Sequence, residues 1–250
     1  MAPPIELEPD KILATIQQLE RRIAERFAGS GLAGVTQQLS TVAGRAVVRA
    51  EQIRRPSLRL RLVSGVLLAA MGWLLWYAVT HARPPPGTFE AFDLVQAIEA
   101  LLSALALLGV TVLFVTTLEG RAKRKKALAA LHELRVLAHV IDMHQLAKDP
   151  ERLHDDFAPT ESSPAVPLTP FELDRYLNYC GDLLALVGKV AAYYLSSFQD
   201  EVVLAAVNEI EDLTNGLSRK VWQKLMLLDQ LFPDGKRAPT GAPRQPPSER

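Results

Sequence analysis

Two long apolar stretches constrain this chain more than any other feature. Residues 62–80 contain no charged side chain, and residues 97–118 contain only Glu99, close to their start. At 1.5 Å per residue, helices over these stretches are about 28 and 33 Å long. The hydrocarbon core of a bilayer is about 30 Å thick, so each stretch can cross it once. We therefore predict transmembrane helices at 58–81 and 93–120.

Basic residues indicate how these helices are oriented. Six arginines lie between residues 45 and 61 and five lysines or arginines between 121 and 126, whereas only Arg83 lies between the two stretches. Because basic residues stay on the cytoplasmic side, we expect both termini in the cytosol and the helices in a bacterial cytoplasmic (inner) membrane. The basic runs would contact anionic lipid headgroups. The formal net charge of zero gives no indication of nucleic-acid binding.

The segment between the two spans is short. Residues 82–92 include a stiff run of three prolines that begins at Pro84, and they are too few to fold alone. Asp93, with Gln96 three positions later, predicts the N-terminal cap of the second span. We therefore expect a short outer loop and no extracellular domain.

The N-terminal part, residues 1–57, predicts two cytosolic amphipathic helices separated by Gly29-Ser30-Gly31. Apolar residues at helical spacing form one stripe in each helix. The first stripe is Ile12, Ile16, Leu19 and Ile23, and the second is Val35, Leu39, Val42 and Ala46. These helices could pack within the chain or bind another copy.

The second span is expected to continue as a cytosolic helix over 121–148. Its apolar stripe is Ala127, Leu131, Leu134, Ala138 and Ile141. Lys148-Asp149-Pro150 would end this helix. The proline-rich residues 149–169 indicate a linker.

The C-terminal residues 170–232 predict a hairpin of two helices. Thr169, Pro170 and Glu172 have the pattern of a capping box, and Asp200 is expected to cap the last helix. The first helix carries a seam with alternating spacings of four and three, which is typical of coiled-coil packing. This seam is Leu173, Leu177, Cys180, Leu184, Val187, Ala191, Tyr194 and Phe198.

The last helix carries an apolar stripe from Val203 to Phe232, which Asn215-Gly216 could interrupt. Residues 233–250 lack apolar side chains and predict a disordered tail. The fold class expected for the whole chain is all-α: an integral membrane two-helix hairpin with a cytosolic helical bundle or coiled-coil-like domain.

Histidines and acids near the end of the second long helix are candidate metal ligands, but their spacing does not form a site. His132 and His139 lie about 10 Å apart along a helix, too far to share an ion at about 2 Å. His139 and Asp142 could share one, but His144 points elsewhere, and Glu133 follows His132 directly. We therefore expect no metal and no cofactor.

Two other features are candidates for catalytic chemistry, but neither has the context that such chemistry needs. His154-Asp155-Asp156 is similar to the doublet of metal phosphohydrolases, but it falls in the predicted linker, whereas that chemistry needs a packed helix. Cys180 is the only cysteine, so it excludes an internal disulfide. Its seam position predicts a buried, inert thiol.

Glu99 is expected near the outer end of the second span, where a helix dipole favours an acid. Glu99, Ser103 and Thr111 can share one helical face. In a homo-oligomer, they could line a pore.

These patterns predict an interaction protein rather than an enzyme, one that mediates assembly or signalling with further copies of itself or with another membrane or cytosolic protein. Lateral oligomerisation through the cytosolic seams is the expected mechanism. The alternatives are a homo-oligomeric ion pore and a membrane-tethered metal-dependent enzyme that uses His139 and Asp142. The C-terminal helices resemble those of uncharacterised bacterial membrane proteins, a resemblance that implies no activity.

Overall fold

A computed structural model describes residues 7–55, 58–81, 91–154, 157–158, 160–163 and 167–233. The described residues form helices and connecting turns and contain no strand, which confirms the all-α prediction for this part of the chain. The expected outer loop up to residue 90, the tail from residue 234, Asp155 and Asp156 lie outside the described residues.

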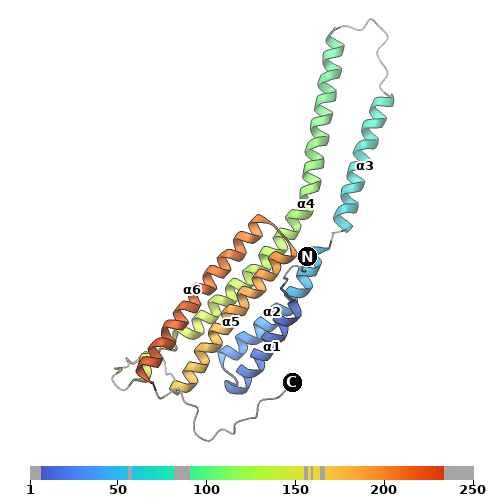
Figure 1. The fold of residues 1–250 in the computed structure, drawn as a ribbon. Coiled ribbons are helices and arrows are strands. Elements are labelled where there is room, and N and C mark those ends of the chain that lie inside the picture. The colour runs from blue at the N-terminus through green and yellow to red at the C-terminus, as the bar shows by residue number, and fades with distance from the viewer. Residues whose placement is uncertain are drawn as a thin grey trace, which may run out of the picture. The chain divides into compact units, whose positions relative to one another are not determined.

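Six α-helices and one short 3-10 helix follow one another along the described residues (Figure 1). The helices are α1 (Pro9–Arg26), α2 (Gly31–Arg54), α3 (Leu58–His81), α4 (Ala91–Leu146), the short 3-10 helix η1 (Pro150–Leu153), α5 (Pro170–Ser197) and α6 (Glu201–Leu231).

Two boundaries follow from local chemistry. Gly29 has a φ of 71°, a left-handed conformation that glycine adopts without steric cost, and it separates α1 from α2. Asp93 is not a cap, because α4 begins at Ala91 and Asp93 lies within its first turn. Sequence patterns often misplace a helix end by one or two residues.

The chain divides into two compact units, one formed by Met1–Gln52 with Ala127–Arg250 and the other by Ile53–Lys126. The first unit is a helical bundle built from α1, α2, the last part of α4, α5 and α6 (Figure 1). Its core is apolar, and all of the predicted stripe residues of α4 are buried: Ala127, Leu131, Leu134, Ala138 and Ile141.

Helix α5 supplies the largest share of this core. Seven of the eight predicted seam residues are at most 1% exposed: Leu173, Leu177, Cys180, Leu184, Val187, Ala191 and Tyr194. Phe198 differs, because α5 ends at Ser197 and Phe198 is its half-buried C-cap. Further positions of α5 are also buried, including Tyr176, Leu183 and Val190. The buried surface is therefore wider than a two-helix seam.

A capping box starts α5, as its sequence suggested. Thr169 Oγ1 accepts a hydrogen bond from Glu172 N at 3.2 Å, and Glu172 Oε2 accepts one from Thr169 N at 2.8 Å. These bonds from Thr169 lower the pKa of Glu172. Two backbone donors at the helix start are satisfied in this way.

Helix α6 packs along α5 and is capped by Asp200, whose carboxylate accepts from Val202 N and Val203 N. Asn215-Gly216 does not interrupt it, because α6 is continuous through Leu231. Thr214 is buried there in place of the predicted Leu213, which is half-buried.

The N-terminal helices belong to the same bundle. Helix α1 packs against α5 and buries Ile16, Leu19 and Ile23. Helix α2 buries all four residues of its predicted stripe. The sequence left open whether these helices pack within the chain or against another copy. In this structure their apolar stripes are covered within one chain.

The second unit carries the apolar stretches. Among the described residues, one helix, α4, is long and apolar enough to cross a membrane. It contains an 18-residue window with a mean hydropathy of 2.4, none of which is buried. The corresponding described segment of α3, Gly65–Leu74, is shorter. Large apolar side chains of this unit, such as Leu105 and Phe114, are more than half exposed, at 52% each.

Candidate functional site

An ion-pair cluster joins α2 to α4 on the bundle surface. Glu133 Oε1 lies 2.9 Å from Arg49 Nη1, and Glu133 Oε2 lies 3.2 Å from Arg45 Nη2. The two arginines are one helical turn apart, so both reach the same carboxylate. The hydrogen bond to Glu133 raises the pKa of Arg49. This cluster fixes how α2 lies along α4.

Tyr194 of α5 lies beneath this cluster. The Tyr194 side chain is 1% exposed, and its burial raises the pKa of its hydroxyl. The positive charge of Arg49 acts in the opposite direction on that pKa. Tyr194 was predicted only as a seam residue, and it brings α5 to the same junction as α2 and α4.

A groove of about 480 Å³ lies beside the cluster, between α2 and α4. It is lined by Gln37, Gln38, Thr41, Val42, Arg45, His132, Glu133, Val136 and Leu137. His132 is exposed there, while the Glu133 carboxylate is already engaged by two arginines. Within this adjacent pair, Glu133 therefore serves ion pairing, which sequence spacing alone does not reveal.

The other candidate metal ligands on α4 are separated by their contacts. His139 is exposed, and Asp142 Oδ1 accepts a hydrogen bond from Gln145 Nε2 at 2.6 Å. The His144 ring packs directly against Gly31 of α2, where any side chain would overlap it. Over the part of the chain that the structure describes, no group of three His, Cys, Asp or Glu side chains is placed to hold a metal ion.

Cys180 is fully buried in α5. Burial raises the pKa of its thiol to about 12, so the thiolate, which is the reactive form, is scarce at neutral pH. His154 follows η1, and its ring lies 6.3 Å from the ring of Phe232. Cys180 is therefore a core residue, whereas His154 is exposed beside Phe232.

The proposed pore residues lie on the exposed apolar part of α4. Glu99 and Ser103 are exposed, and Thr111 is half-exposed. The Thr111 hydroxyl donates to Leu107 O at 2.8 Å, so its own helix satisfies it. This contact explains a hydroxyl on an exposed apolar helix without a pore.

A lysine clamp at the end of α4 was missed by sequence reasoning. Lys224 of α6 donates from Nζ to the carbonyl oxygens of Gln145 at 2.6 Å and Lys148 at 3.2 Å. Free carbonyls at a helix C-terminus attract a cation through hydrogen bonds and the helix dipole. Burial lowers the pKa of Lys224. The only sequence signal was a lysine beside the apolar stripe of α6.

None of the family models, curated proteins or solved structures compared with this chain is significantly similar to it.

Replacing Lys224 with Met should destabilise the bundle by about 1–3 kcal/mol, because the carbonyls at the end of α4 lose a charged donor. The matched control is Lys220→Met, a neighbouring exposed position on the same helix. The free energy of unfolding, measured by denaturant titration of the full chain in detergent, should fall only for Lys224→Met. An equal effect of the two substitutions would contradict the clamp.

Proposed function

We propose that this chain is a two-pass protein of a bacterial cytoplasmic membrane whose cytosolic helical bundle mediates assembly or signalling. Both termini would lie in the cytosol, and the basic residues beside the spans would contact anionic headgroups. In this account α3 and the first part of α4 form the membrane hairpin. The protein acts by binding other proteins or further copies of itself rather than by catalysis.

The continuity of α4 carries this proposal. One unbroken helix, Ala91–Leu146, includes an apolar window with no buried residue and later a stripe buried in the bundle core. Exposed apolar surface of this length is costly in water but stable in lipid. The same helix therefore supports both a membrane anchor and a folded cytosolic unit.

The route to assembly differs from the one that the seams suggested. The α5 seam is covered by helices of its own chain, so lateral oligomerisation would use outer surfaces of the bundle or the membrane helices. The ion pore and the metal-dependent enzyme have less support. The Thr111 hydroxyl is satisfied within its helix, and Asp142 is engaged by Gln145.

Membrane insertion can be tested with one charge. Leu105→Arg places a cation within the apolar window of α4, which costs about 2.5–3.5 kcal/mol at the centre of a membrane helix. The wild-type chain should stay with membranes in alkaline carbonate, and the variant should be partly released. Met143→Arg, on the same helix but exposed on the bundle, should behave like the wild type. Release of the wild-type chain would contradict the membrane assignment.

Assembly can be tested by the protein mass of the detergent-solubilised particle, with bound detergent subtracted. We expect a discrete multiple of the 27.5 kDa chain, or a stoichiometric complex with another protein. A solitary chain in several mild detergents would contradict an assembly role. For a discrete oligomer, unchanged ion flux through liposomes after Glu99→Gln would exclude the acidic pore mouth.

A further inference from the structure

Three arginines and two aromatic rings surround a pocket between α1 and α5. The pocket has a volume of about 600 Å³ and is lined by Arg22, Glu25, Arg26, Phe171, Arg175 and Tyr179. Both helices belong to the bundle unit and pack against each other. The pocket therefore brings together side chains that are far apart in the sequence.

Each arginine lies over an aromatic ring. The guanidinium carbon of Arg22 is 5.4 Å from the ring centre of Tyr179. Those of Arg26 and Arg175 are 5.5 and 5.6 Å from the ring centre of Phe171. Contacts of this kind hold a guanidinium group by its face and leave its N–H edges available for other acceptors.

The Tyr179 ring beneath Arg22 is fixed by packing. Tyr176 and Tyr179 are each 4% exposed, and the Phe27 ring meets both edge-on, with centre distances of 5.4 and 6.2 Å. This support restricts the Arg22 side chain before any ligand binds, whereas Arg26 and Arg175 lie over the half-buried Phe171 ring. Preorganised donors lose less conformational entropy on binding.

One carboxylate, Glu25, belongs to the pocket lining, and three others lie nearby. Glu172 is engaged by Thr169 in the capping box and also interacts electrostatically with Arg26. Asp174 accepts from Asn178 Nδ2 at 3.1 Å and lies 3.6 Å from Arg175 Nε. Asp182 lies on the Arg22 side and is outside the pocket lining. The lining itself has three guanidinium groups and one carboxylate, Glu25.

We propose that this pocket binds a phosphate group, with Arg22, Arg26 and Arg175 as its ligands. A carboxylate offers two oxygens and one charge, which one arginine can match bidentately. A phosphate group offers three or more acceptor oxygens and up to two charges, which matches several guanidinium groups lining one pocket. The phosphate could belong to a soluble molecule or to a lipid headgroup. This site goes beyond the proposed function and does not depend on it.

The test is calorimetric titration of the full chain with pyrophosphate, in a maltoside detergent and a low-salt buffer without phosphate. We expect saturable binding of one pyrophosphate per chain. Arg22→Gln, Arg26→Gln and Arg175→Gln should each weaken it about tenfold or more, because each removes charged hydrogen bonds. Arg26→Lys should also weaken it, since lysine keeps the charge but loses the planar fork.

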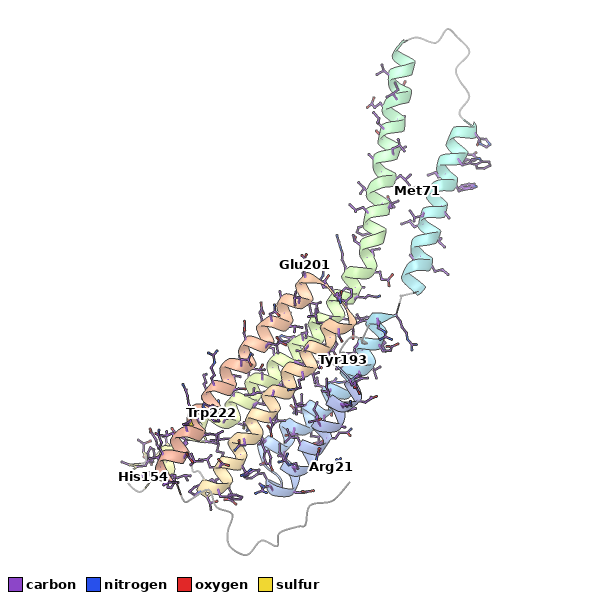
Figure 2. All side chains as sticks on the ribbon, viewed as in Figure 1. Arg21, Met71, His154, Tyr193, Glu201 and Trp222 are labelled. Atoms are coloured by element: carbon purple, nitrogen blue, oxygen red, sulfur yellow. The ribbon has the colours of Figure 1, made fainter. Side chains whose placement is uncertain are left out.

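Arg21→Gln is the matched control, because Arg21 is an exposed arginine of α1 outside the pocket lining (Figure 2). It should leave the affinity unchanged. Absence of saturable binding to any phosphate compound, or an equal loss in Arg21→Gln, would overturn the proposal. Thermal unfolding of each variant without ligand shows whether the bundle is retained. Because the three arginines are exposed, we expect each single variant to fold.

A second titration with short-chain phosphatidic acid in the same detergent identifies the source of the phosphate. Binding of both compounds, sensitive to Arg26→Gln, supports recognition of the phosphate group itself. Binding of the lipid alone, with the same sensitivity, supports a membrane source. Lipid binding that persists in all three glutamine variants would overturn the site.

Discussion

The bundle depends on the other helices that cover the apolar surface of α5. Thirteen of the 28 residues of this helix are buried, and they occupy more than one side of it. Each buried large apolar side chain contributes roughly 1.5–3 kcal/mol, but one neighbouring helix cannot cover so wide a surface. Helix α6 covers one side and α1 another. The N-terminal helices are therefore part of the fold and are not an accessory segment.

Helical periodicity was sufficient to predict the class of fold and most of the core. The alternation from Leu173 to Tyr194 marks residues that are all buried, because side chains three and four positions apart share a helix face. It did not reveal the wider buried surface of α5, since Tyr176 and Val190 lie off the seam and are covered by other helices. The interruption that Asn215-Gly216 could have caused does not occur, because packing of α6 on α5 outweighs the weak local preference for a turn.

The contacts that fix the helices relative to each other could not be predicted from sequence. Lys224 meets the carbonyls at the end of α4 across 79 positions, and Glu133 meets Arg49 across 84. Likewise, Gly31 was expected only as a helix breaker, yet it also makes room for the His144 ring. Each of these roles depends on a partner that local spacing does not specify. The arginine pocket between α1 and α5 arises in the same way, since its members gain their role only from the docking of two helices.

One chain closes its own bundle in this structure, and a designed disulfide between α5 and α6 can test this packing. A side chain at Gly188 of α5 would place its Cβ 3.5 Å from Thr214 Oγ1 of α6, so the two positions face each other across the contact between these helices. Gly188→Cys with Thr214→Cys, in a Cys180→Ala background, should form this bond on mild oxidation in membranes. We expect the oxidised protein to migrate as a single chain on a non-reducing gel. Disulfide-linked dimers, or thiols that stay free, would contradict it.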